Sequence, residues 1–171
     1  MKRISNKNGP SDARQRGSVI VELALMLPLM AILVLGATDL GIIVREHQIL
    51  QNAAREGARF SAQPANNIAT SNPTATANAI RDKVINYLAE ERINITSTNC
   101  TEDVPNKQWN CGAITIRQHY PIPTVVDGVT LTELGSSVSV TYNRSFLFKG
   151  GSLFQFNTVS LNGNAVFHNL Y

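Results

Sequence analysis

Few residues of this 171-residue chain have the types and spacing that chemistry requires. The three histidines, His47, His119 and His168, lie far apart in the sequence, and none belongs to a recognisable metal-ligand or nucleophile pattern. The chain contains no G-x-S-x-G, no H-E-x-x-H and no phosphate-binding glycine motif. We therefore expect no catalytic site, no metal site and no cofactor, and we expect that the protein is not an enzyme.

Glu22 is the ionisable residue whose position most needs an explanation. It is the one charged residue of the apolar run from Val19 to Thr38, which has about the 20 residues that a bilayer-spanning helix needs. A carboxylate at the bilayer centre costs about 2.5–3.5 kcal/mol on insertion scales, and less near the interface. Gly17 and Ser18 come just before the run. The sequence therefore predicts a membrane helix over about residues 19–38, with a carboxylate one turn inside its first end.

The distribution of charge orients this helix. Residues 1–16 contain five basic residues and one acidic residue, whereas the rest of the chain has 10 basic and 11 acidic residues. Basic residues directly before a span keep the N-terminus in the cytoplasm, so the chain beyond Val44 is expected outside it. The net charge of +3 comes from this tail and gives no support to nucleic-acid binding. A cleaved secretory signal is the alternative, although its apolar core is usually only about 7–15 residues long.

The helix is expected to continue beyond the membrane to about residue 62. Apolar or small side chains recur there at three- and four-residue spacing and form one stripe. Its members are Ile42, Ile49, Leu50, Ala53, Ala54, Gly57 and Ala58. Because alanine and glycine let another backbone approach closely, the stripe is expected to pack on the protein's own sheet, and part of it also on neighbouring subunits. Asp39, at the far end of the apolar run, is expected at the membrane interface.

The remaining residues, 63–171, are expected to form one α+β domain. Thr74 to Arg92 has helical periodicity, with Thr74 as a possible N-cap. Its apolar stripe consists of Ala77, Ile80, Val84 and Leu88. The exported segment from Asn94 to Cys111 is polar, and its cysteines, Cys100 and Cys111, are expected to form a disulfide because their number is even and the compartment is oxidising.

Three strands are expected in the C-terminal half, and short connections favour an antiparallel meander. Residues 113–120 alternate loosely, with Pro121 and Pro123 ending the strand, and Asp127-Gly128 indicates a turn. Ser136 to Arg144 and Val159 to Leu170 are the other two strands. The inward residues expected for the last strand are Val159, Leu161, Ala165 and Phe167, with a possible register shift at Gly163. Residues 146–156 place four aromatics around two glycines, either covering the core or contacting a membrane or partner.

Two segments of the helix resemble a known family. The Gly17-Ser18 junction with Glu22 resembles the processing site of type IV prepilins. More narrowly, Arg16 to Pro28 resembles the start of TadE-like proteins, the minor pseudopilins of tight-adherence (Tad, Flp) pilus systems, and so does Leu50 to Phe60. The core of this second segment is Asn52, Ala53, Ala54, Arg55, Glu56, Gly57, Ala58 and Arg59. The C-terminal half matches only in general character, and Ser18 stands where many type IV pilins have Phe.

The resemblance implies a fold and a function. It implies a cytoplasmic leader (1–17), a long helix (18–62) and a pilin-like periplasmic domain with an antiparallel sheet (63–171), anchored once in the inner membrane. A prepilin peptidase would cut between Gly17 and Ser18, and the new Ser18 ammonium would pair with Glu22 of a neighbouring subunit.

The implied function is that of a minor pseudopilin that helps to assemble or prime a Tad-type pilus for adhesion or secretion. Its implied partners are other pilins and pseudopilins, Tad inner-membrane assembly proteins, the peptidase and the membrane, and not nucleic acid. One alternative is a periplasmic enzyme, which would need a pocket with converging titratable groups. The other is a membrane-anchored periplasmic binding or adhesion module. It would leave Gly17-Ser18 uncut.

Overall fold

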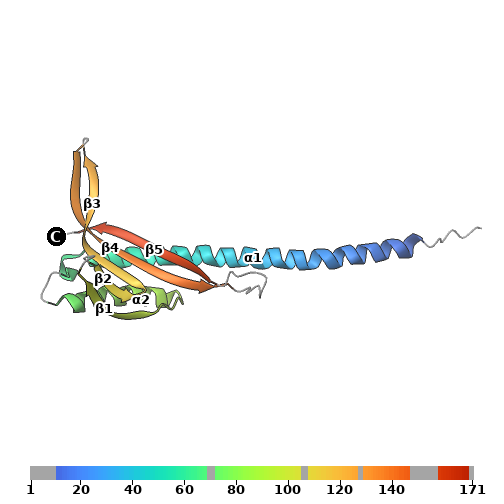
Figure 1. The fold of residues 1–171 in the computed structure, drawn as a ribbon, viewed down its shortest axis with the longest axis horizontal. Helices are drawn as coiled ribbons and strands as arrows, with labels where there is room; N and C mark the ends of the chain where they lie inside the picture. The colour runs from blue at the N-terminus through green and yellow to red at the C-terminus, as the bar shows by residue number, and fades with distance from the viewer. Residues whose placement is uncertain (1–10, 69–71, 105–107, 127–128, 147–157, 170–171) are drawn as a thin grey trace, which may run out of the picture.

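The computed structural model consists of a long N-terminal helix that projects from a small α+β domain (Figure 1). It describes residues 11–68, 72–104, 108–126, 129–146 and 158–169, and at 11–18, 124–126, 129 and 131 it describes the backbone alone. Helix α1 spans Ser11–Ser61, 51 residues, which corresponds to about 77 Å at 1.5 Å per residue. Its second half lies along the domain, and its first half extends beyond it (Figure 1). The expected α+β class is confirmed.

The first half of α1 has the properties of a membrane helix. Every large apolar side chain from Val19 to Leu35 is exposed, with fractional exposures between 44% and 71%. Among the helices that the structure describes, α1 is the one long and apolar enough to cross a membrane. Exposed apolar surface on this scale is favourable only against lipid or another protein, so this half suits a single-pass membrane anchor.

Helix α2, Pro73–Glu90, packs beside the second half of α1. Its buried residues are the four predicted from periodicity, Ala77, Ile80, Val84 and Leu88. The predicted N-cap is wrong: Asn72 caps the helix, with its side-chain Oδ1 accepting a hydrogen bond from the Ala75 N–H at 3.2 Å. Asparagine caps well because its short side chain reaches the orphan donors of the first turn. Between the helices lies one 3₁₀ turn, Pro64–Asn66.

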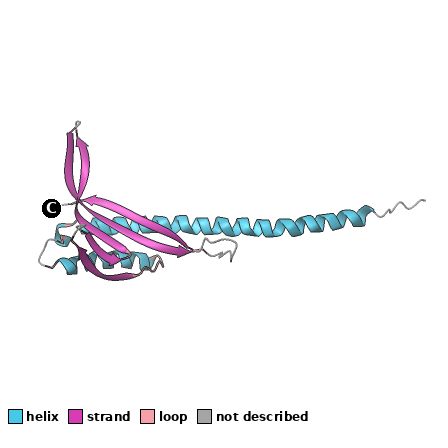
Figure 2. Ribbon diagram, in the orientation of Figure 1, coloured by secondary structure: helices cyan, strands magenta, loops and turns pink. Residues whose placement is uncertain are grey.

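Five strands form one sheet in the order β1-β2-β3-β4-β5, each antiparallel to the next (Figure 2). The strands are β1 (Ser97–Asp103), β2 (Gln108–Gly112), β3 (Ile114–Val126), β4 (Val129–Ser145) and β5 (Thr158–His168). The expected antiparallel meander is confirmed. Strands β1 and β2 form a hairpin in the segment 94–111, for which the sequence indicated polarity and a disulfide but no strand. Hydrophobic alternation does not reveal β1, since Cys100 is its one buried residue.

Three further strand predictions need correction. Pro121 does not end β3, which continues to Val126 and pairs with β4 throughout apart from one register shift between Arg117 and Tyr120. In β5 there is no register shift at Gly163, which pairs with Val140 in regular order. Phe167 shares the face of Ala165 but is 39% exposed, so it does not belong to the buried core as predicted. The predicted turn at 127–128 lies outside the described residues.

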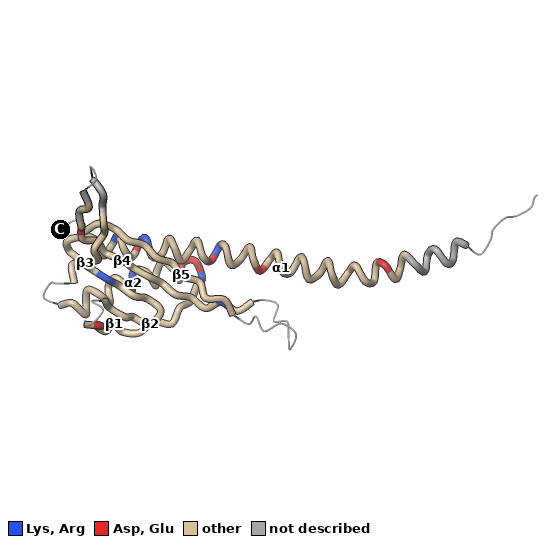
Figure 3. The backbone as a smooth tube through the Cα atoms, turned by 45° about the horizontal axis from the view of Figure 1, so that its top comes forward, with Lys and Arg blue, Asp and Glu red and all other residues tan. Residues whose placement is uncertain are grey.

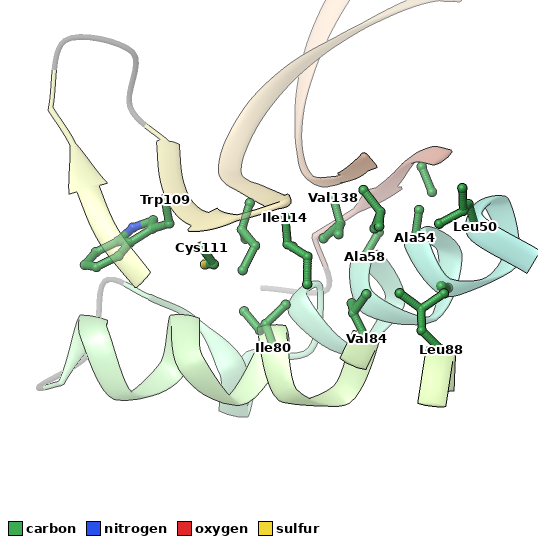
Figure 4. Packing of buried hydrophobic residues seen from close by; sticks show 14 of the residues in the cluster. Leu50, Ala54, Ala58, Ile80, Val84, Leu88, Trp109, Cys111, Ile114 and Val138 are labelled. Atoms are coloured by element: carbon green, nitrogen blue, oxygen red, sulfur yellow. The ribbon is translucent and has the colours of Figure 1, made fainter. Parts of the chain in front are cut away.

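The core lies between the two helices and one face of the sheet (Figure 4). Side chains of α1 and α2 pack against the inward residues of β2, β3 and β4. The largest fully buried side chains include Leu50, Ile80, Val84, Leu88, Cys111, Ile114, Ile116, Val138 and Val140. The opposite face of the sheet presents polar residues such as Thr115 and Ser139. The core therefore attaches the domain to the second half of α1 and leaves the first half uncovered.

Candidate functional site

The predicted processing junction lies in the projecting half of α1. Gly17 and Ser18 belong to the helical backbone. Glu22 is exposed, about 26 Å along the helix axis from Asp39 at 1.5 Å per residue. Charged residues of the described chain gather over the domain and the adjoining part of α1 (Figure 3). Glu22 is thus a solitary carboxylate on an apolar, uncovered surface, while cleavage at Gly17-Ser18 stays a prediction.

A cluster of three charged side chains lies where the projecting half of α1 meets the domain. Arg144, near the end of β4, donates a hydrogen bond through Nη1 to Glu46 Oε1. Its Nη2 lies 3.8 Å from Asp39 Oδ1. Asp39 and Arg144 are buried, with 5% and 8% of their surface exposed. Asp39 is thus buried against the domain, while its position at the membrane interface stays a prediction.

The cluster attaches the end of β4 to α1 at residues 39–46. Asp39 is one residue beyond the predicted span of 19–38, and Glu46 is two helical turns further along the same face. Within the described structure, Glu46 Oε2 and Arg144 Nε are buried without a hydrogen-bond partner. Two carboxylates and one guanidinium leave a net charge of −1. A buried charged group needs its partners to offset desolvation, so this joint is sensitive to the loss of any member.

One feature of the sequence indicates this cluster. Asp39 and Glu46 are spaced by seven residues and fall on the apolar stripe of α1 instead of its polar face. Acidic residues on a core-facing stripe call for a basic partner. Nothing in the sequence, however, indicated which basic residue would supply it.

The small residues of the motif are explained by packing within the chain. Ala53, Ala54 and Ala58 have no exposed surface. A Cβ added at Gly57 would contact the Val84 side chain and lie 3.3 Å from Val138 Cγ1. The stripe therefore packs on the protein's own helix α2 and sheet, as expected, and these residues are not available to neighbouring subunits.

The polar members of the motif are placed differently. Asn52, Arg55 and Arg59 are exposed, and Arg55 Nη1 donates a hydrogen bond to Asn52 Oδ1 at 3.4 Å. Glu56 forms an exposed ion pair with Lys83 of α2, with 3.3 Å between Oε1 and Nζ. Packing in this chain accounts for the alanines and the glycine, whereas Asn52, Arg55 and Glu56 make surface contacts.

A disulfide joins Cys100 to Cys111, with a Cα–Cα distance of 4.2 Å. It links β1 to β2 where both strands lie over α2, and the Cys100 N–H donates to Asn78 Oδ1 of that helix at 2.9 Å. Closing so short a loop contributes about 2–3 kcal/mol on the chain-entropy model. The bridge supports a hairpin that has little apolar surface of its own.

The histidines do not converge. His47 is exposed, His119 has a positive φ of 57° in β3, and His168 Nδ1 lies 2.8 Å from Glu133 Oε2. Among the described side chains, no three His, Cys, Asp or Glu residues are arranged to hold a metal ion. Most of the aromatic segment 146–156 lies outside the described residues.

Comparison with known proteins gives one match. Residues 17–59 match the family model of the TadE-like proteins. No curated protein and no solved structure matches the chain. The matched segment begins at Gly17, contains Glu22 and ends at Arg59, so it covers the junction, the uncovered half of α1 and the small-residue motif. Residues 17–59 are therefore similar to the TadE-like family, and helix α1 carries this match.

Proposed function

We propose that this protein is a minor pseudopilin that helps to assemble or prime a Tad-type pilus used in adhesion or secretion. Similarity to the TadE-like family associates it with the Tad pilus machinery in general, and α1 suits a single-pass membrane anchor. The observation that carries the proposal is the continuity of the family match from Gly17 to Arg59. The matched segment contains the predicted junction, the uncovered apolar part of α1 and the part of α1 that packs on the domain.

The two halves of α1 have different roles in this proposal. The domain core uses the second half of α1, from Ile49 to Ala58. The half from Val19 to Leu35 is exposed around its whole circumference, so it can contact lipid before assembly and neighbouring helices afterwards. Anchored in the inner membrane with its N-terminus in the cytoplasm, the chain would hold its domain in the periplasm, where a disulfide persists.

Processing supplies the chemistry of assembly in this proposal. A prepilin peptidase hydrolyses the Gly17–Ser18 peptide bond and leaves an ammonium on Ser18. Glu22, four residues later, carries a carboxylate on the same uncovered surface. The ammonium of one subunit pairs with Glu22 of the next, which offsets much of the cost of holding either charge in a low-dielectric environment. The neighbours would be other pilins or pseudopilins, delivered by Tad inner-membrane assembly proteins.

The substitution Glu22→Leu tests this mechanism in a complementation assay for surface pili. The variant is expected to be cut, inserted and abundant, yet to fail in piliation and in co-purification with pilus components. Thr38→Leu is the matched control: it removes a polar group from the same apolar run, where Thr38 Oγ1 only bonds its own helix at Val34 O. Normal piliation by the Glu22 variant would contradict the pairing, and normal piliation without the protein would contradict the assembly role.

A further inference from the structure

Strands β3 and β4 continue beyond the sheet as a two-stranded arm, residues 120–126 and 129–134 (Figure 1). Strand β5 pairs with β4 only from Gly135 onward, and β2 pairs with β3 at Thr115 and Ile116. A register shift after Arg117, with His119 at a φ of 57°, marks the base of the arm. An isolated two-stranded hairpin is only marginally stable in water, so the arm calls for a partner.

Helix side chains contact part of each outer edge of the sheet. On β5, Gln51 of α1 donates to Asn162 O and accepts from the Asn164 N–H, each at 3.4 Å. On β1, Arg81 of α2 donates to Thr98 O at 2.8 Å, and Asn78 accepts from the Cys100 N–H at 2.9 Å. Exposed edges invite pairing with other strands, and here helix side chains cover the middle of β5 and the first part of β1.

The β3 edge of the arm is closed by proline. Pro121 pairs with Leu134 and Pro123 with Thr132. Since proline has no N–H, these positions turn their backbone nitrogen away from β4, and the outer edge of β3 has no donor at either. The same alternation turns the backbone groups of residues 130, 132 and 134 outward on β4. Leu134 O indeed accepts from the Asn169 N–H at 3.0 Å, on that outer side.

The β4 edge of the arm is the one that carries no such protection. Residues 129–134 read Val-Thr-Leu-Thr-Glu-Leu, without proline or lysine, the residues that usually blunt a strand edge. Thr130 and Thr132 are exposed, and β-branched residues favour strands. The contrast between a proline-closed β3 edge and an open β4 edge identifies the surface available for strand addition.

We propose that this β4 edge pairs antiparallel with the same edge of a second copy of this chain. With Thr130 opposite Thr132 of the second copy, the two threonines exchange backbone hydrogen bonds. Thr–Thr pairs across strands are favourable. Glu133, the one charged residue of 129–134, then faces Val129 of the second copy, so the twofold arrangement opposes no like charges.

A pair of such short strands buries much less than a standard stable interface. The contact is therefore weak in dilute solution and needs copies held side by side. A membrane anchor on α1 supplies that confinement by raising the effective concentration of arms. The pairing is a lateral contact between anchored chains.

Cross-linking of the full chain in cell membranes tests the pairing. Thr130→Cys supplies a thiol for a short bis-maleimide, and both native cysteines are already joined in a disulfide. A cross-linked homodimer is expected from Thr130→Cys but not from Thr101→Cys on β1. Adding Thr132→Pro removes an outward N–H without touching the β3–β4 ladder and should lower the yield about tenfold or more, while Thr132→Val, which keeps the N–H, should not.

Oppositely charged substitutions in two co-expressed copies distinguish a loss of pairing from misfolding of the arm. In the Thr130→Cys background, Thr132→Lys or Thr132→Glu alone should reduce cross-linking, and co-expression of the two should restore a Lys–Glu heterodimer. Undiminished cross-linking with Thr132→Pro, equal yield from Thr101→Cys, no recovery on co-expression, or an adduct to a different protein would each overturn the proposal.

Discussion

Replacing Arg144 by methionine probes the joint between helix and sheet. Methionine retains much of the length of the arginine stem but removes the guanidinium that contacts Glu46 and Asp39. The two carboxylates then remain in a site where Asp39 is 5% exposed. Removing one partner of a buried ion pair costs about 3–5 kcal/mol, because the remaining charge is desolvated without compensation.

Arg45→Met is the matched control. Arg45 lies one residue before Glu46 on the same helix, and its Nη2 is 3.6 Å from Glu91 Oε2. Its side chain is 69% exposed, against 10% for Arg144. An exposed pair is worth about 0–1 kcal/mol. The same substitution should therefore cost several-fold more at residue 144 than at residue 45.

Urea unfolding of the full chain in detergent micelles provides the assay, followed by the fluorescence of Trp109, the single tryptophan. Arg144→Met should lower the free energy of unfolding by about 3–5 kcal/mol. A triple variant with Asp39→Leu and Glu46→Leu should recover much of this loss, because it leaves no stranded charge. Equal losses at residues 144 and 45, or no recovery in the triple variant, would refute the reasoning.

Two further predictions concern packing and covalent support. Gly163→Ala should destabilise the domain by about 1–3 kcal/mol, because the new Cβ would overlap the Leu50 carbonyl and lie 2.9 Å from the Gln51 backbone N. Gly41→Ala, with open space around its Cβ, is the control. Equal urea midpoints of the two variants would contradict the tight helix–strand contact. Replacing Cys100 and Cys111 together by serine should lower stability by about 2–3 kcal/mol, read from the same unfolding curves, whereas an unchanged midpoint would remove the disulfide from the account.

Sequence periodicity predicted the elements that bury one regular face. The stripe of α2 and the alternation around Val138 and Val140 were sufficient, because apolar spacing reports directly which face meets the core. The apolar run after Ser18 likewise predicted the projecting helix. These predictions depend on neighbours in sequence, which is why they succeeded without knowledge of the tertiary contacts.

The missed features depend on partners far apart in the chain. Arg144 meets Glu46 across 98 residues, and no local pattern pairs them. The proline pair in β3 indicated the end of a strand, whereas at an edge proline only removes an outward donor. Strand β1 was missed because disulfide bonding and side chains of α2 hold it instead of apolar alternation.

The mature N-terminus tests the central claim most directly. Intact-mass analysis of the chain extracted from membranes of cells with an active prepilin peptidase should give a protein that begins at Ser18, and the same chain from cells without the peptidase should retain residues 1–17. A chain that still begins at Met1 or Lys2 when the peptidase is active would contradict the proposal that this protein is a processed pseudopilin.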